Sequence, residues 1–156
     1  MGNKITVTTI VLKDNFSAVK DALKKDALEK AAMAAGQVVE AHAKINVNEN
    51  FSSHATGGAG LAGSIHTVLS ESDDNHAVAD VGSGLVYARM RELGGVIKTV
   101  FAKWLTFQTY DGQWHKVKVV HQEGKPWLRP AVDENLDEIR DAAGYQIKKS
   151  IEESLK

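Results

Sequence analysis

The sequence contains no cysteine, no long apolar run and no strong excess of charge of either sign. The lack of cysteine excludes a disulfide framework and thiolate metal sites, and it is consistent with assembly in a reducing cytosol. No apolar run approaches the roughly 18–20 residues that a membrane-spanning helix needs, so we expect no membrane partner. The formal net charge of −1 gives no electrostatic reason to expect nucleic acid or an anionic membrane as the main ligand.

The composition is otherwise that of an ordinary globular protein. A chain of 156 residues, with 43% hydrophobic and 25% charged residues, is long enough to bury a core of its own. We therefore expect a single domain over residues 1–156. Residues 1–5 contain no apolar segment, and we expect no signal peptide there.

Apolar spacing predicts two long helices. In residues 16–45 the apolar positions recur every three or four residues, which places them on one face of a helix. These positions are Phe16, Val19, Leu23, Ala27, Ala31, Ala34, Val38, His42 and Ile45. Gly36, within this segment, indicates close packing or a bend. The second helix covers residues 130–155, with Pro130 in its first turn and acidic residues near its start.

Alternating and β-branched segments predict strands. Residues 4–12 form the first strand, and residues 64–128 are predicted to form a sheet that includes a hairpin over residues 103–120. The Asp111-Gly112 pair, between two alternating runs, is a strong hairpin signal. Together these elements predict an α+β fold, in which a small, mostly antiparallel sheet packs with a long N-terminal helix and a C-terminal helix.

A polar, glycine-rich segment over residues 46–63 predicts a flexible loop that orders against a neighbour in an assembly. Within it, residues Gly58–Gly63 match the dinucleotide-binding fingerprint by letter. That fingerprint requires a strand directly before it and a helix after it. Here a polar loop precedes the glycines and strand-like residues follow them. We therefore expect no cofactor, and a small nucleotide-binding domain or enzyme that uses this loop is kept only as a distant alternative.

The histidines and carboxylates form no recognisable catalytic or metal-binding pattern. His115 and His121 fall on one face of a predicted strand, but two ligands do not make a zinc site. Ser64, His66 and Asp80 can be combined into a triad on paper, yet no nucleophile elbow surrounds the serine. The sequence therefore predicts no catalytic residue and no metal, and a protein that is not an enzyme.

A local basic stretch accompanies two tryptophans in the last third of the chain. It comprises Lys116, Lys118, His121, Lys125 and Arg129, close to Trp114 and Trp127. Such residues contact nucleic acid through phosphate pairing and base stacking. They equally suit a solvated sheet face or an acidic partner surface, and the nearly neutral whole chain favours this second interpretation.

Several short motifs occur in a fixed order along the chain. They are Thr56-Gly57 with Leu61 and Ser64-Ile65, then Tyr87-Ala88, then Glu92-Leu93-Gly94-Gly95, the predicted hairpin, and Pro126-Trp127-Leu128-Arg129-Pro130-Ala131 before the last helix. This succession resembles the small neck proteins of tailed bacteriophages, which are head–tail joining or tail-completion proteins. The resemblance covers roughly residues 15–155, and the proline-tryptophan exit motif is its most specific part.

The resemblance implies a structural virion protein that joins the head or connector to the tail as a ring around the DNA path. Its expected partners are other neck, connector and tail proteins, together with copies of itself in a cyclic hexamer or dodecamer. Weak, non-specific contact with DNA in the lumen is compatible with this role. The expected location is the neck or tail region of the virion, assembled in the host bacterial cytoplasm. A tail terminator or a tail-tube subunit is the alternative within the same machine.

Aromatic and arginine side chains near these motifs are the expected contacts between subunits or with partners, because such residues are favoured at interfaces. The candidates are Tyr87, Arg89, Arg91, Glu92, Trp127, Arg129, Phe51 and Leu61. Large aromatics are also favoured in cores, so a core position remains open for Tyr87 and Trp127.

Overall fold

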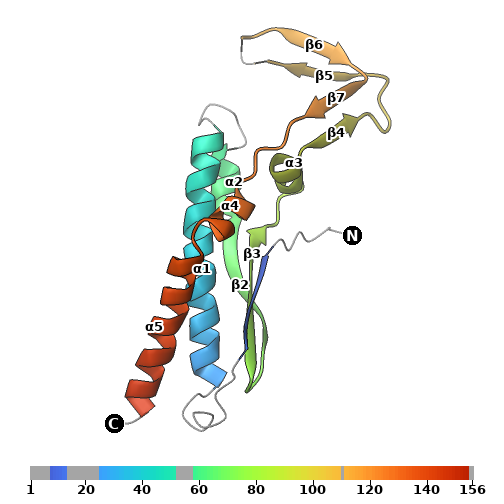
Figure 1. Cartoon of the computed structure of the whole chain (residues 1–156). Coiled ribbons are helices and arrows are strands. Elements are labelled where there is room, and N and C mark those ends of the chain that lie inside the picture. The colour runs from blue at the N-terminus through green and yellow to red at the C-terminus, as the bar shows by residue number, and fades with distance from the viewer. Residues whose placement is uncertain (1–7, 14–24, 52–57, 110, 155–156) are drawn as a thin grey trace.

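The computed structural model describes residues 8–13, 25–51, 58–109 and 111–154. The molecule is elongated, with two helices side by side, a three-stranded sheet against one of them and an arm of short strands that projects from one end (Figure 1). The elements in chain order are β1 (Thr8–Lys13), α1 (Lys25–Asn50), α2 (Gly58–Ser64), β2 (Ile65–Ser72), β3 (His76–Ser83), α3 (Ala88–Leu93), β4 (Gly95–Lys98), β5 (Leu105–Gln108), β6 (Trp114–Val117), β7 (Val119–Gln122), α4 (Leu128–Asp133) and α5 (Leu136–Ser154). Within these described residues, no helix has both the length and the apolar character needed to cross a bilayer.

Helix α1 is the centre of the fold, because it packs against α4 and α5 on one side and against β2 and β3 on another. Its buried side chains are mostly alanine and valine, and small side chains let the neighbouring elements come close. The core that they form includes Val39, Ala43 and Val47 from α1, Leu128 from α4 and Ile139 from α5. The α+β architecture predicted from the sequence is confirmed.

The apolar face of α1 lies about one residue away from the predicted stripe. Val39, Ala43 and Val47 are fully buried, whereas Ile45 is 49% exposed and Val38 is only partly buried. The alanine-rich middle of this helix is apolar on more than one side, so periodicity alone did not select the correct face.

The three-stranded sheet has the antiparallel order β1-β3-β2. Its turn between β2 and β3 is held by Asp73, whose carboxylate accepts the N–H groups of Asn75 at 2.7 Å and His76 at 2.9 Å. Strand β3 is central and carries small buried side chains towards α1. Gly36 of α1 meets this sheet so closely that a Cβ at Gly36 would lie 2.4 Å from the Thr67 Cγ2 atom. The prediction of close packing at Gly36 is therefore confirmed.

The predicted single sheet over residues 64–128 is wrong, because the strands after α3 form two further, separate pairs. Strand β5 pairs with β6 as the predicted hairpin, and Gly112 adopts a φ of 81° in its turn. The second half of the hairpin ends at Val117, the chain bends at Lys118, and β7 then pairs with β4 instead. This partner is more than twenty residues earlier in the chain, and local alternation carries no information about it.

The flexible loop predicted over residues 46–63 is also wrong where the structure describes it. Residues 46–50 continue helix α1, because the side-chain amides of Asn46 and Asn50 donate to the carbonyl oxygens of Trp127 and Pro126 at 2.9 and 3.0 Å. Residues 58–63 belong to α2, whose Leu61 is buried. Residues 4–7 of the predicted first strand, 16–24 of the predicted helix and 52–57 of the loop lie outside the described residues.

The last helix is divided in two rather than continuous over residues 130–155. Pro130 lies in the first turn of α4, as predicted, and α4 ends at Asp133. Asn135 then separates the helices, since its side chain donates to the Ala131 carbonyl at 3.1 Å while its own carbonyl accepts the Ile139 N–H at 3.0 Å. Asp137 and Glu138 occupy the first turn of α5, where acidic side chains favour the helix dipole.

Candidate functional site

The most distinctive surface is the projecting arm, which we define as residues 95–122 (Figure 1). Among the described residues, eight of the fifteen exposed large hydrophobic side chains belong to this short segment. They are Val96, Ile97, Val100, Phe101, Trp104, Phe107, Trp114 and Val119. Apolar side chains gathered in this way on a protruding element mark a surface that binds another molecule.

The hairpin of the arm has two different faces. On one face Phe107 lies opposite His115, and their rings stack with centroids 5.5 Å apart. On the other face Trp104 receives two cations, with the Lys116 and Lys118 Nζ atoms 5.7 and 5.3 Å from its ring centroid. The strand register confirms that side chains alternate between the two faces, but the expectation of one covered apolar face is wrong, because Phe107 on one face and Trp104 and Trp114 on the other are all exposed. Among the described residues, no helix or strand covers either face of this hairpin.

The arm is also basic. It contains four lysines, Lys98, Lys103, Lys116 and Lys118, against one acidic residue, Asp111, which leaves a net charge of +3 with neutral histidines. Asp111 stabilises the hairpin turn, where its carboxylate accepts hydrogen bonds from the Thr109 hydroxyl and the Gln113 N–H. These hydrogen bonds, the Thr109 bond first, hold the pKa of Asp111 below its usual value, so the carboxylate stays charged within the turn.

The root of the arm is a close crossing of two backbone segments. Gly94 ends α3 with a φ of 71°, a conformation that glycine adopts readily. A Cβ at Gly94 would lie 2.5 Å from the Gly124 nitrogen, and one at Gly124 would lie 2.5 Å from the Gly94 nitrogen. Next to this crossing, the Lys125 N–H donates to the Arg91 carbonyl at 2.8 Å. The arm therefore leaves the body of the subunit in a defined direction.

Glu92 fastens this root to the start of α4. Its side chain is only 4% exposed and accepts three backbone N–H groups, those of Trp127 at 2.6 Å, Leu128 at 2.9 Å and Arg129 at 3.1 Å. These are unpaired donors of the first turn of α4, and the residue that precedes that turn makes no side-chain cap of its own. A carboxylate at this end of a helix is also favoured by the helix dipole.

The predicted interface residues fall into two groups. Glu92, Trp127, Phe51 and Leu61 are buried within the subunit, where they hold its parts together. Tyr87, Arg89 and Arg129 are exposed, and Arg91 is partly buried with its guanidinium 5.0 Å from the centre of the Phe51 ring. Glu92 brings Trp127 and Arg129 together through the hydrogen bonds described above. Only the exposed group offers surface to a partner.

A small cavity lies under α3 and is lined by Gly82, Ser83, Ala88, Arg89, Glu92, Trp127 and Leu128. Its volume of about 10 Å³ is enough for one water molecule and far too small for a nucleotide. The indole Nε1 of Trp127 is buried and has no hydrogen-bond partner among the described residues.

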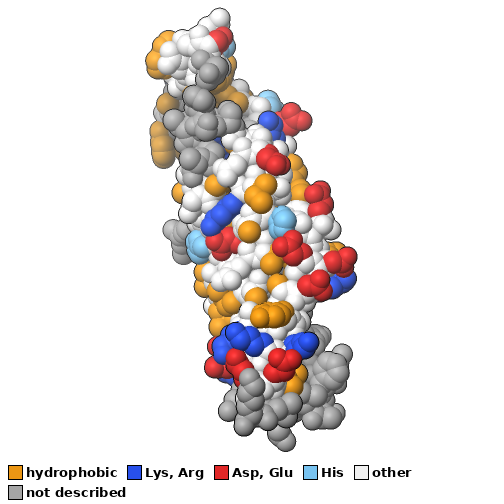
Figure 2. Space-filling model, turned by 90° about the vertical axis from the view of Figure 1, so that its left-hand side faces the viewer, with side chains coloured by type: hydrophobic (Ala, Val, Ile, Leu, Met, Phe, Trp, Pro, Cys, Tyr) orange, Lys and Arg blue, Asp and Glu red, His pale blue; other side chains and the backbone are white. Residues whose placement is uncertain are grey.

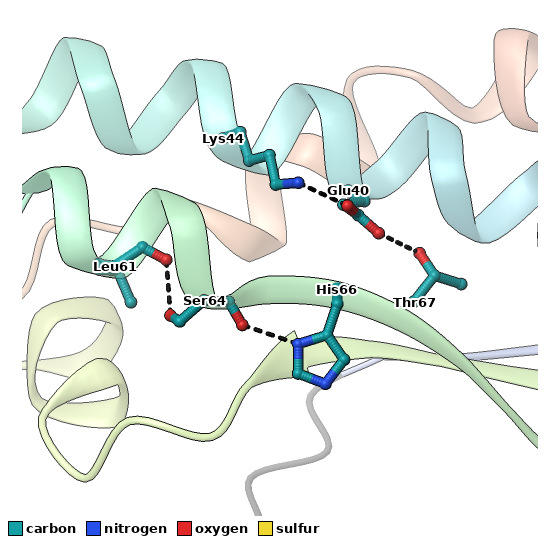
Figure 3. A network of polar contacts seen from close by, with 6 residues as sticks. All are labelled: Glu40, Lys44, Leu61, Ser64, His66 and Thr67. Carbon is teal, nitrogen blue, oxygen red and sulfur yellow. Dashed lines mark hydrogen bonds and ion pairs between the residues drawn. The ribbon is translucent and has the colours of Figure 1, made fainter.

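Polar contacts between α1, α2 and β2 have a structural role (Figure 3). The Glu40 carboxylate accepts hydrogen bonds from Lys44 and from the Thr67 hydroxyl, which ties α1 to β2. Burial raises the pKa of Glu40, but the two hydrogen bonds and the Lys44 charge outweigh it, so this pKa is lowered overall.

Ser64, His66 and Asp80, considered above as a possible catalytic triad, do not form one. The Ser64 hydroxyl donates to the Leu61 carbonyl at 2.7 Å, and His66 Nδ1 meets the Ser64 backbone carbonyl at 2.8 Å rather than the hydroxyl (Figure 3). Residues 58–64 are helical, so the glycines of the dinucleotide fingerprint do not form a phosphate loop. In the part of the chain that the structure describes, no group of three or more His, Asp or Glu side chains is placed to hold a metal ion.

A second charged surface covers the junction of α4 and α5. Within residues 133–141 all five acidic side chains are exposed and one arginine accompanies them, for a net charge of −4. The acidic residues are Asp133, Glu134, Asp137, Glu138 and Asp141, which we call the acidic junction. Figure 2, viewed from the α5 side, shows red side chains gathered on one part of this helical face. Glu138 contacts His42 of α1 at 2.8 Å, and Asp137 contacts Arg140 at 3.3 Å.

The sequence predicted the hairpin and assigned its basic stretch, with Lys116 and Lys118, to a solvated sheet face or an acidic partner surface. It did not predict the apolar part of the arm or the acidic junction as surfaces. The sequence feature that could have identified the arm is the mixture of lysines and large apolar residues within residues 95–122. For the acidic junction, the same carboxylates were interpreted only as favourable charges at a helix start.

Comparison with known proteins gives one family match. The model of the HK97-gp10-like family, described as "Bacteriophage HK97-gp10, putative tail-component", matches residues 11–94, which is more than half of the chain. The match begins in β1 and ends at Gly94, directly before the arm. Neither the curated proteins nor the solved structures include a significant match. The resemblance to a phage assembly family, inferred from the motifs, is confirmed, and the chain belongs to the HK97-gp10-like family of phage tail components.

Proposed function

We propose that this tail component acts in the neck of the virion, where it joins the head or connector to the tail as a closed ring around the DNA path. Membership of a phage tail-component family supports a structural role in the virion. The observation that supports a joining role is the arm, which projects from the subunit and exposes apolar side chains. The core of the subunit contains no residue of the arm.

A ring is the assembly that suits this shape. The arm projects at one end of the subunit, and we propose that it contacts a different surface on the body of the next subunit, in a head-to-tail rather than a reciprocal arrangement. Head-to-tail contacts close into rings when the rotation between neighbours permits, and otherwise continue as open helices. A joining protein needs the closed form, whereas a tail-tube subunit stacks further.

The proposed partners are neighbouring copies of the chain and the connector and tail proteins on either side of the ring. Tyr87, Arg89, Arg91 and Arg129 remain the proposed contact residues outside the arm, since all four reach the surface near its root. Non-specific contact of lysines with DNA in the lumen is compatible with this arrangement. The work of the protein is binding, carried out in the virion after assembly in the host cytoplasm.

The proposal is tested by the mass of the purified protein in solution, followed by negative-stain images of each large species, with and without neck and tail proteins of the same phage. A ring of one discrete size supports the joining role. Open-ended tubes move the protein into the tail shaft, and rings that bind only the end of preformed tubes indicate a tail terminator. A monomer that binds no virion protein, but has a higher melting temperature in the presence of a nucleotide, contradicts the proposal.

A further inference from the structure

We propose that the arm of one subunit docks on the acidic junction of a second copy of this chain. The inference rests on the proposed function, because it names the contact that would join neighbouring subunits in the ring. Its occupant is a second copy, and both surfaces that it needs are present on each subunit.

Charge complementarity is the first argument. The arm carries a net charge of +3, and its single carboxylate is held within the hairpin turn. The acidic junction carries a net charge of −4 over nine residues. Lys116 and Lys118 stand together on the Trp104 face of the hairpin, so they present their charges in one direction. Opposite potentials of this kind set the register of an interface and suppress wrong partners.

Apolar complementarity is the second argument. Leu136 and Tyr145 of α5 are 45% and 64% exposed and border the acidic junction, with Tyr145 one helical turn from Asp141. In the arm, Trp114 is 70% exposed and Phe101 is fully exposed. An aromatic centre surrounded by complementary charges is the usual composition of a protein–protein contact.

The contact must be made between copies. In Figure 1 the arm extends to one side from the end of the body, while the junction of α4 and α5 lies midway along the body, so the two surfaces of one subunit do not meet. DNA would account for the lysines of the arm, but not for Val96, Ile97, Val100 and Phe101, which offer nothing to a phosphate backbone. A protein surface with acidic and apolar side chains accounts for both.

Site-specific cross-linking tests the contact directly, because the chain contains no cysteine. Lys116→Cys and Asp141→Cys variants, carrying different affinity tags, are co-expressed and treated with a short bismaleimide at the concentration where the wild type self-associates, or at the highest attainable one. We expect a cross-linked heterodimer that contains both tags. The matched control pairs Lys116→Cys with Asp74→Cys, an exposed residue in the β2–β3 turn, and yields at least tenfold less heterodimer.

Charge exchange tests the energetics of the same contact. Two double variants should each weaken self-association at least tenfold: Lys116→Glu/Lys118→Glu in the arm and Asp133→Lys/Asp141→Lys in the acidic junction. A mixture of the two, or the quadruple variant that carries all four substitutions (the fourfold variant), should recover most of the association. The control Asp74→Lys/Glu153→Lys changes the charge by the same amount away from the acidic junction and should leave association unchanged. Unfolding curves of each variant establish that the subunit remains folded.

The outcomes separate this inference from the proposed function. If rings form but the heterodimer is absent and the fourfold variant does not recover, the ring exists and the arm does not make its contact. If Lys116→Glu/Lys118→Glu instead loses binding to duplex DNA while self-association is unchanged, the arm binds DNA and the inference is overturned. If neck and tail proteins of the same phage are added and Lys116→Cys then cross-links only to one of them, the occupant is that protein and not a second copy.

Discussion

Replacement of Glu92 by alanine should strongly destabilise the subunit, because three backbone donors depend on this one carboxylate. The N–H groups of Trp127 and Leu128 are buried, whereas that of Arg129 is nearer the surface and can bind water instead. A buried donor without a partner costs about 1–3 kcal/mol, so the two buried groups together cost about 2–6 kcal/mol. For a domain of this size, that loss lowers the melting temperature by about 4–24 °C.

Thermal and urea unfolding of Glu92→Ala and Glu92→Gln measure this effect. Glutamine keeps one acceptor oxygen, so its loss of stability should lie between those of alanine and the wild type. Glu123→Ala is the control, since this glutamate is exposed and makes no hydrogen bond among the described residues. A melting temperature of Glu92→Ala within about 1 °C of the control would contradict the role of Glu92 as a helix cap, because the three contacts would then contribute nothing measurable.

Three further perturbations have signs that the structure determines. Gly36→Ala places a Cβ against Thr67, which Glu40 holds in place, so overpacking should cost about 1–3 kcal/mol, offset in part by a helix-propensity gain of about 1 kcal/mol, and lower the urea midpoint. The control Gly144→Ala adds its Cβ in open space and should stabilise the protein by about 0.5–1 kcal/mol. Equal shifts of the two urea midpoints would contradict close packing at Gly36. The lowered pKa of Glu40 means that its stabilising effect is present above its unfolded value and is lost as the pH falls through the lowered pKa. Between about pH 6 and pH 3 the wild type should therefore lose more stability than Glu40→Gln, and parallel urea midpoints would argue against this. Gly94→Ala strains a positive φ and meets the Gly124 backbone, so it should lower stability by about 1–3 kcal/mol and speed proteolysis within the arm, with Gly63→Ala as the unstrained control.

The parts of the fold that depend on local chemistry were predictable from the sequence. The Asp111-Gly112 turn, the end of α3 at Gly94 and the position of Pro130 in a first helical turn all follow from the conformations that these residues prefer. The α+β class followed because apolar periods of two and of three to four residues alternate along the chain.

The errors have a common physical cause, which is a partner distant in sequence. Residues 46–50 have the composition of a loop, but Asn46 and Asn50 are bound by carbonyl groups 76 to 81 residues later. Strand β7 alternates as if it continued the hairpin, and it leaves because β4 supplies its hydrogen bonds. Local propensity is overridden in both cases by tertiary contacts.

The candidate site shows the same division. Glu92 and Trp127 were selected because a charged residue beside an aromatic suits an interface, yet the donors to Glu92 come from residues 35 to 37 positions later and make it a buried cap. Arg89 and Arg129 remain at the surface, where a partner can reach them. The arm became evident only when the exposed apolar side chains of residues 95–122 were seen together on one projection.

The mass of the assembled protein in solution, with images of the same sample, shows whether the subunits form a joining ring. We expect a closed ring of one discrete size, formed by the chain alone or on addition of its neck and tail partners. Open-ended tubes, or a monomer that persists in the presence of every partner, would contradict it.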